Sequence, residues 1–146
     1  MKTTLFAAAF ALAASIGFSA CTDTTRRTVD VLVIGGTTSG TSAAIAAARE
    51  GVSTLVVEPT PMLGGMLTAQ GVSAIDGNDG LPSGFWNEFR EALRSHYGGP
   101  EALRTGWVSA TQFEPSVADS IFKAKAAAEP MLEVIHGYRL VEVYRE

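Results

Sequence analysis

The sequence predicts an α/β fold in which a parallel sheet is flanked by helices, on the evidence of three adjacent segments. Residues 29–34 are nearly all β-branched or apolar, as in a strand that is buried on both faces. The alanine-rich residues 41–50 end at Gly51, and glycine commonly terminates a helix. A second apolar run covers residues 53–57. Strand, helix and strand within about thirty residues form a βαβ unit, which makes the two strands parallel.

Length and composition fit one globular domain. A chain of 146 residues is long enough to bury one sizeable core. The net charge of −4 argues against a nucleic-acid partner, because proteins that bind nucleic acids carry a basic face. The single cysteine, Cys21, excludes cysteine-ligated zinc, iron–sulfur clusters and dithiol chemistry from the chain. Asp76 and Asp79 lie in a glycine-rich loop, where a metal site is conceivable but solvated turn acids are commoner, so we predict no metal site.

The N-terminus is typical of an export signal. Lys2 supplies a positive charge, and residues 5–18 form an apolar run that is too short to span a bilayer. The following Ser19, Ala20 and Cys21 resemble the lipobox of bacterial lipoproteins. That resemblance implies cleavage before Cys21 and a lipid anchor on this residue.

The export signal divides the chain into three parts. We expect a signal peptide over residues 1–21, a polar tether over residues 22–28 and a folded domain over residues 29–146. The protein is then a bacterial membrane lipoprotein on the periplasmic or outer-membrane face. The alternative is an ordinary secretory peptide cleaved nearby, which would give a secreted or periplasmic protein.

A loop and a helix are expected after the βαβ unit. Residues 61–80 are rich in Gly, Thr and Asp without a strong period, which predicts a long functional loop. Ser83 can cap the helix that follows, and Gly98 can end it.

The last third of the chain predicts one more helix and two strands. Ser116 and Asp119 resemble a capping box for a helix that runs to about Glu129, just before a proline. Residues 131–135 and 139–144 are apolar runs on either side of a short turn, and they are predicted as strands.

The turn between the first strand and the first helix resembles a phosphate-binding loop. The fingerprint G-x-G-x-x-G would place glycine at positions 35, 37 and 40, and position 37 is threonine. Gly35 can make the tight turn and Gly40 can let the helix pack on the strand, while backbone N–H groups hold the phosphates. The Cβ of Thr37 restricts access to the backbone, but a glycine precedes it and two hydroxyl side chains follow. The candidate cradle is Gly35, Gly36, Thr37, Thr38, Ser39 and Gly40.

An acidic residue ends the second strand. Glu58 lies eighteen residues after Gly40 and is followed by Pro59. An acid near this spacing can accept hydrogen bonds from a ribose diol, and its charge would oppose a 2′-phosphate, which disfavours NADP. Spacing alone leaves open a plain βαβ unit with a glycine-rich turn and a surface glutamate.

The next segment carries a resemblance to a known family. Residues 56–71 read VVEPTPMLGGMLTAQG and place Gly64, Gly65 and Met66 just after Glu58. With the glycine turn, they resemble the FAD-dependent oxidoreductases, which belong to the two-dinucleotide-binding-domain flavoproteins. Later pieces, such as FEPSVADSIF and VIHGYRLVEV, are similar too, so the resemblance covers residues 29–143. The matching residues are Asp30, Gly35, Gly36, Gly40, Ala43, Ala44, Ala46, Ala47, Ala48, Arg49, Gly51, Glu58, Gly64, Gly65 and Met66.

The resemblance implies a Rossmann-like FAD/NAD(P)-binding domain with FAD as the cofactor. Residues 35–40 would cradle the pyrophosphate, and Glu58 would hold the adenosine ribose. Gly64 and Gly65 would form a second backbone loop near the phosphates, and the strand around Val141 would lie beside the adenine. The expected cofactor-binding residues are Gly35, Gly36, Thr37, Thr38, Ser39, Gly40, Glu58, Pro59, Gly64, Gly65, Met66 and Val141.

The resemblance also implies a larger enzyme, because such enzymes are several times longer. Residues 29–146 then look like the truncated N-terminal part of an FAD-binding domain with an incomplete parallel sheet, and we expect the chain alone to be inactive. Residues 66–70 hold no cysteine, so disulfide reductase chemistry is not expected. His96 and His136 are isolated histidines without an evident partner. The sequence identifies neither catalytic residues nor the small-molecule substrate.

Two other functions stay open at this level. The chain could be a non-catalytic lipoprotein binding module with a βαβ core, in which residues 35–40 form a turn or bind a small ligand. It could also be the NAD-binding domain of a dehydrogenase. The double glycine after Glu58 favours FAD over NAD. Export favours FAD too, because FAD can travel tightly bound inside a protein.

Overall fold

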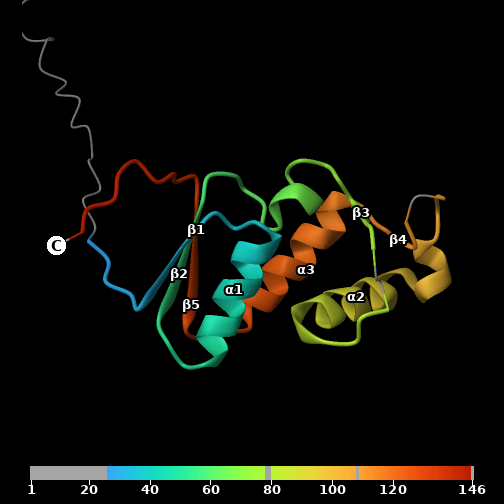
Figure 1. Cartoon of the computed structure of the whole chain (residues 1–146), viewed down its shortest axis with the longest axis horizontal. Coiled ribbons are helices and arrows are strands. Elements are labelled where there is room, and N and C mark those ends of the chain that lie inside the picture. Colours follow the sequence, from blue (N-terminus) through green and yellow to red (C-terminus); the bar gives the residue numbers. More distant parts are fainter. Residues whose placement is uncertain (1–25, 78–79, 108, 146) are drawn as a thin grey trace, which may run out of the picture.

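The chain folds with a βαβ unit first and further helices and strands after it (Figure 1). The structure is a computed structural model that describes residues 26–77, 80–107 and 109–145. The described elements are β1 (Val31–Ile34), α1 (Thr38–Arg49), β2 (Thr54–Glu58), η1 (Gly65–Leu67), β3 (Ala74–Ile75), α2 (Gly84–Tyr97), η2 (Pro100–Leu103), β4 (Thr111–Gln112), α3 (Pro115–Ala127) and β5 (Leu132–His136).

The main sheet is parallel, and its strand order is β1-β2-β5 (Figure 1). The register aligns Val33, Val56 and Val134 across the three strands, and it sets Glu58 beside His136 at the carboxyl end. All three strands therefore end at the same edge of the sheet. The predicted α/β class is confirmed, and the parallel strands with flanking helices have the Rossmann-like arrangement.

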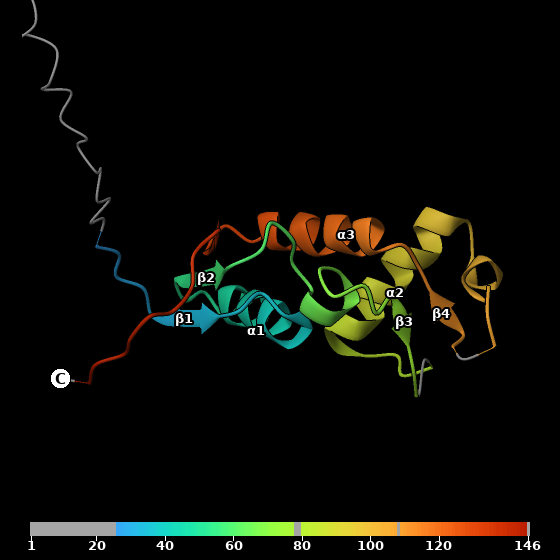
Figure 2. The same cartoon turned by 90° about the horizontal axis from the view of Figure 1, so that it is seen from above.

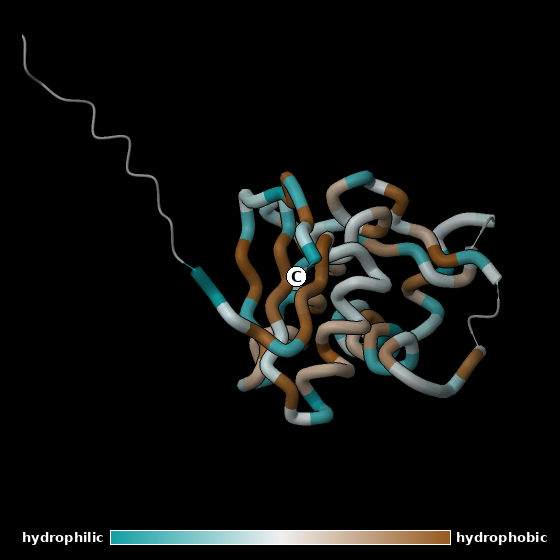
Figure 3. The backbone as a smooth tube through the Cα atoms, turned by 60° about the vertical axis from the view of Figure 1, so that its left-hand side comes forward, coloured by the Kyte–Doolittle hydropathy of each residue, from teal (hydrophilic) through white to brown (hydrophobic). Residues whose placement is uncertain are grey.

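Both α1 and α3 lie on one side of the sheet, where α1 packs on β1 and β2 and α3 packs on β5 (Figure 1). The strands are mainly apolar (Figure 3). On β1, however, Leu32 is 53% exposed and Ile34 is 46% exposed. The prediction that residues 29–34 are buried on both faces is wrong for these side chains, because no described element covers them.

The alanine-rich composition of α1 explains its close packing. Ala44, Ile45 and Ala48 point into the protein and are buried. Small side chains at two of these three positions let the helix axis approach the strands. The predicted helix is confirmed, and it ends just before Gly51.

An aromatic cluster joins α2 to α3, and Figure 2 shows α3 running beside both α1 and α2. Phe89 of α2 stacks on Phe122 of α3 with ring centroids 4.8 Å apart, and Phe113 meets Phe89 edge-on at 5.6 Å. Such aromatic pairs contribute about 0.5–1.5 kcal/mol each beyond their burial. Leu63 and Leu67 join this core from the segment after β2. The second glycine loop is thus attached to the α2–α3 core.

Ion pairs join the three helices at the C-terminal end of α1. Arg49 donates to both carboxylate oxygens of Glu88 at 2.6 and 3.0 Å, and to Glu129 at 2.7 Å. Lys125 of α3 donates to Glu88 at 3.0 Å. The hydrogen bonds from Arg49, and then those from Lys125, lower the pKa of the Glu88 carboxyl to about 2.

Ser83 is the N-cap of α2, as predicted, although its side chain makes no capping hydrogen bond, and Gly98 ends the helix in a left-handed conformation. The predicted capping box of α3 is wrong. The N-cap of α3 is Glu114, and Pro115 occupies the first turn, so Ser116 already lies inside the helix. Proline is common at this position because its fixed φ suits the start of a helix. Asp119 therefore lies on the side of α3 and not at its N-terminus.

Two predictions about the chain between and after the helices also fail. The predicted loop over residues 61–80 contains η1 and β3, and β3 pairs antiparallel with β4 through Ala74–Gln112 and Ile75–Thr111. The predicted strand over residues 139–144 is not formed, and this segment is exposed. A strand needs a neighbour for its backbone hydrogen bonds, and no described strand pairs with these residues.

Within the part of the chain that the structure describes, no helix is long and apolar enough to cross a membrane. The predicted signal peptide and the lipidation site at Cys21 lie outside the described residues.

Candidate cofactor-binding site

The first glycine turn connects the carboxyl end of β1 to the N-terminus of α1. The N–H of Gly35 donates to the carbonyl of Val57 at 2.9 Å, which extends the pairing of β1 with β2 by one bond. In open α/β sheets, ligands bind at this edge, outside the carboxyl ends of the strands. The first amides of α1 have no intrahelical partner, and with the helix dipole they favour an anion here.

Gly40 permits the close packing of α1 on the end of β1. A Cβ at this position would lie 2.1 Å from the carbonyl oxygen of Gly35, a distance that no side chain can adopt. This is the role of the third glycine in a dinucleotide-binding turn. The sequence-based role of Gly40 thus agrees with the geometry.

Thr37 is the N-cap of α1 and stands at the position of the missing glycine. Its hydroxyl accepts the N–H of Gly40 at 3.0 Å and lies 3.2 Å from the hydroxyl of Ser39. Its backbone φ of −64° is ordinary for any residue, so the turn does not need glycine here for its conformation. The threonine does change the site, because its hydroxyl already accepts the N–H of Gly40, which a phosphate could otherwise bind.

The second glycine loop meets the first turn directly. The N–H of Gly64 donates to the carbonyl of Gly36 at 2.7 Å, and the hydroxyl of Thr38 donates to the carbonyl of Gly64 at 2.8 Å. A Cβ on Gly65 would come within 3.0 Å of the Cα of Thr37. The Thr38 hydroxyl proton is therefore used to hold the two loops together, whereas the hydroxyls of Thr37 and Ser39 lie at the start of α1.

Glu58, at the end of β2, is buried beside the first glycine turn, with only 6% of its surface exposed. One carboxylate oxygen accepts the N–H of Gly36 at 2.7 Å, and the other accepts the N–H of Thr60 at 2.8 Å. The alternative of a surface glutamate is wrong. Each oxygen has a further lone pair, so the carboxylate can accept additional donors such as ribose hydroxyls.

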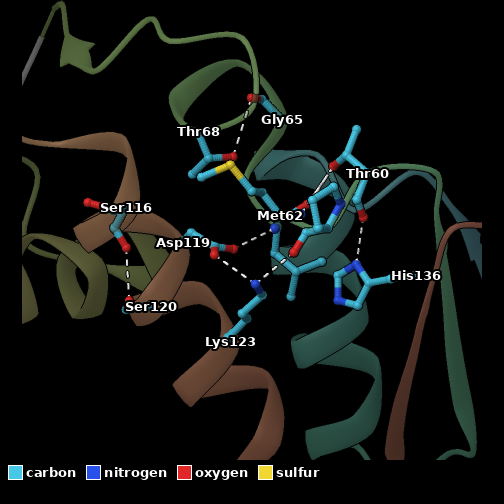
Figure 4. A network of polar contacts seen from close by, with 11 residues as sticks. Thr60, Met62, Gly65, Thr68, Ser116, Asp119, Ser120, Lys123 and His136 are labelled. Carbon is cyan, nitrogen blue, oxygen red and sulfur yellow. Dashed lines mark hydrogen bonds and ion pairs between the residues drawn. The ribbon is translucent and has the colours of Figure 1, made fainter.

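The segment between Glu58 and the second glycine loop is held by side chains from two distant elements (Figure 4). The Nδ1 atom of His136 lies 2.7 Å from the carbonyl oxygen of Thr60. Asp119 and Lys123 of α3 bind residues 61–63 from the other side. Asp119 and His136 lie in the segments FEPSVADSIF and VIHGYRLVEV, which resemble the family, but nothing in the sequence indicates that they bind residues 60–63.

Three of the sequence-predicted residues lie apart from these contacts. Pro59 and Met66 are exposed beside the cradle residues that they flank. Val141 is 90% exposed and belongs to no strand, so the structure does not bring it to the cradle. Among the described residues, no group of three or more His, Cys, Asp or Glu side chains is placed to hold a metal ion.

The fold and these contacts define a dinucleotide-binding α/β domain. The chain belongs to the FAD dependent oxidoreductase family, whose model matches residues 30–146. FAD is therefore its cofactor. No curated protein matches the chain.

Solved structures with a similar trace include three larger proteins. The flavoprotein disulfide reductase RclA from Escherichia coli shares 17% identity over 73% of this chain and 21% of its own, with a TM-score of 0.39. AlpK shares 23% identity over 78% of this chain and 25% of its own, with a TM-score of 0.45. A 3-ketosteroid-Δ4-(5α)-dehydrogenase from Rhodococcus jostii RHA1 shares 16% identity over 82% of this chain and 40% of its own, with a TM-score of 0.40. The chain thus spans between about a fifth and two fifths of the length of these proteins.

The residues present fit FAD. The first turn of α1 lies so close to the end of β1 that a Cβ at Gly40 is excluded. The N-terminus of the helix therefore offers backbone N–H groups to a phosphate. Two further glycines, Gly64 and Gly65, face this turn. A buried carboxylate, that of Glu58, lies below with free acceptor capacity. Phosphates need the first of these features and a ribose diol needs the last.

Proposed function

We propose that this chain is the FAD-binding part of an exported flavin-dependent oxidoreductase. One observation carries the proposal, namely that the two glycine loops meet at Gly36, near the N-terminus of α1, where the buried Glu58 accepts the N–H of Gly36. When bound, FAD supplies the redox chemistry, and the protein binds, orients and tunes it.

Each part of the cradle has a separate task in this proposal. The amides at the start of α1 hold the pyrophosphate, supported by the hydroxyl of Ser39. The carboxylate of Glu58 accepts the ribose hydroxyls while it keeps Gly36 in place. The loop at Gly64 and Gly65 closes the second side of the phosphate site.

A titration with FAD tests this assignment. The purified chain is titrated into free FAD, and quenching of the flavin fluorescence is followed with NAD as a competitor. Saturable binding that NAD does not displace is the expected result. Displacement by NAD would favour a dehydrogenase domain. No binding by a chain that circular dichroism shows to be folded would favour a non-catalytic binding module.

Export and lipid anchoring form the second part of the proposal. They rest on the sequence around Cys21, which would carry the lipid after cleavage. In a bacterial host, the wild-type chain should sediment with membranes, and Cys21→Ser should release it into the soluble fraction. Release of the wild-type chain would favour the ordinary secretory peptide.

We further propose that the FAD-loaded chain shows no steady turnover by itself. The half-exposed Leu32 and Ile34 on the sheet support this, since apolar surface of this kind is normally covered in a complete fold. Assays with a panel of small organic reductants and a reducible dye should give no sustained rate. A sustained rate that depends on bound FAD would contradict the proposal.

A further inference from the structure

One face of α3 is built against the second glycine loop. Asp119, Phe122 and Lys123 are spaced at i, i+3 and i+4, so they share one side of the helix. All three approach the segment that runs from Pro61 to Gly64. No part of the predicted or proposed cofactor chemistry uses them.

Asp119 and Lys123 hold this segment by its backbone (Figure 4). One carboxylate oxygen of Asp119 accepts the N–H of Leu63 at 2.8 Å. The ammonium of Lys123 donates to the other carboxylate oxygen and to the carbonyl of Pro61, both at 2.7 Å. The Asp119 side chain is mostly buried, while that of Lys123 is partly exposed. A charged acceptor makes the bond to the Leu63 amide stronger than a neutral one would.

Phe122 supplies the wall behind Gly64. Its ring is fully buried, and a Cβ on Gly64 would come within 2.6 Å of it. Leu63 is also buried, and a Cβ on Gly36 would lie only 2.5 Å from a methyl carbon of its side chain. Residues 63 and 64 are therefore enclosed between α3 on one side and the first glycine turn on the other.

We propose that Asp119 is a positioning residue of the cofactor site, and that it acts through the amide of Leu63. It sets the place of the Gly64 and Gly65 backbone relative to the N-terminus of α1, and Lys123 orients its carboxylate. The inference rests on the proposed FAD site and assigns to α3 the support of the second loop. FAD affinity should therefore depend on the side chain of Asp119, which does not itself touch the cofactor.

The test compares Asp119→Ala with Asp119→Asn. Asparagine keeps an oxygen that can accept the Leu63 N–H, whereas alanine removes it. We expect FAD binding about tenfold weaker in the alanine variant, as for the loss of one hydrogen bond to a charged group, and within about threefold of wild type in the asparagine variant. Hydrogen exchange at the Leu63 amide should accelerate in the alanine variant without FAD, because this amide loses its acceptor. Loss of the α3 helix would not explain the acceleration, since alanine favours helices.

Two variants on the same helix separate positioning from stability. Ser120→Ala removes a hydroxyl whose hydrogen bond among the described residues lies within the helix, to the carbonyl of Ser116, and it should leave FAD affinity unchanged. Ala124→Gly, at an exposed position, should lower the melting temperature without changing FAD affinity. Equal loss of affinity in Ala124→Gly and Asp119→Ala at the same loss of melting temperature would overturn the proposal.

The remaining outcomes are also decisive. Wild-type affinity in Asp119→Ala would overturn the positioning role and leave the FAD site intact. Failure of the wild-type chain to bind FAD would overturn both. If Asp119→Ala does not fold, Lys123→Met replaces it, since it keeps the aliphatic part of the side chain. This variant should bind FAD about threefold more weakly, and unchanged affinity would again overturn the proposal.

Discussion

At the scale of single residues, Thr37 determines how many backbone N–H groups of the first glycine turn are open to a phosphate. Its hydroxyl caps α1 through the amide of Gly40, and its Cα lies close to Gly65. A threonine thus stabilises the start of the helix at the place where a phosphate would otherwise approach the backbone. Stability of the helix and access for the cofactor are in competition at this one position.

Replacement of Thr37 by glycine should tighten FAD binding several-fold. Glycine frees the amide of Gly40 and removes the Cβ, and as an N-cap it costs only a few tenths of a kcal/mol relative to threonine. Flavin fluorescence titration measures the affinity and thermal unfolding measures the stability. Thr37→Ser, which keeps the hydroxyl cap, should bind FAD like the wild type. Weaker binding in Thr37→Gly would show that the threonine itself contacts the cofactor.

Glu58→Gln should lower both stability and FAD affinity. Both carboxylate oxygens accept backbone N–H groups, from Gly36 and Thr60, and the glutamine amide nitrogen would meet one of these donors without accepting it. A buried donor left without a partner costs about 1–3 kcal/mol. Urea unfolding should show this loss in the absence of FAD. Glu142→Gln, at an exposed carboxylate outside the cradle and outside every described helix and strand, is the control and should change neither quantity.

The contact between the two glycine loops is the decisive feature at the scale of elements. Gly64 has a φ of 106° and packs against Phe122, so both its backbone conformation and its surroundings require the absence of a side chain. The loop thereby links the sheet, through Gly36, to the aromatic core of α2 and α3. A change in α3 is expected to reach the cofactor site by this route.

Gly64→Ala should destabilise the chain by about 3 kcal/mol, from left-handed strain and from overpacking against Phe122. Gly71→Ala is the matched control. Gly71 also has a positive φ, of 73°, but a Cβ there would meet no atom within 4 Å, so only the strain of about 1–2 kcal/mol is expected. Urea unfolding compares the two. Equal losses of unfolding free energy would show that overpacking against Phe122 does not destabilise the Gly64→Ala variant.

The ion pairs of Arg49, Glu88, Lys125 and Glu129 act at the scale of the whole molecule, because they join all three α-helices. They lie at the end of α1 that is remote from the glycine turn. The pKa of Glu88 is lowered from 4.5 to about 2 by Arg49 and Lys125. The charged form of Glu88 is therefore favoured in the folded state.

Acid should weaken the chain as Glu88 is protonated. Since its folded-state pKa is depressed, its contribution is fully present above about pH 4.5 and is lost as the pH falls towards 2. The pairs are partly exposed, so the contribution is about 1 kcal/mol or less. Urea unfolding at pH 6 and pH 3 in low salt should show a smaller difference for Glu88→Gln than for the wild type. Glu101→Gln, at a residue that forms no ion pair with any described residue, should keep the wild-type difference.

The βαβ unit and the glycine cradle could be predicted from the sequence alone. Strand periodicity, the alanine-rich helix and the spacing from Gly40 to Glu58 are local features, because each depends on residues that are near in the chain. Chemistry that depends on backbone conformation leaves a glycine signature in the sequence. For the same reason the resemblance to FAD-dependent oxidoreductases was visible before any distance was known, and the family match over residues 30–146 confirms it.

Only the tertiary structure decided which side chains support that cradle. Asp119 binds the amide of Leu63, fifty-six residues away, and His136 binds the carbonyl of Thr60 across the sheet. A polar side chain chooses its partner among all groups that folding brings within reach, and no local pattern records that choice. The same dependence explains why residues 139–144 form no strand, since a strand exists only where another strand offers its hydrogen bonds.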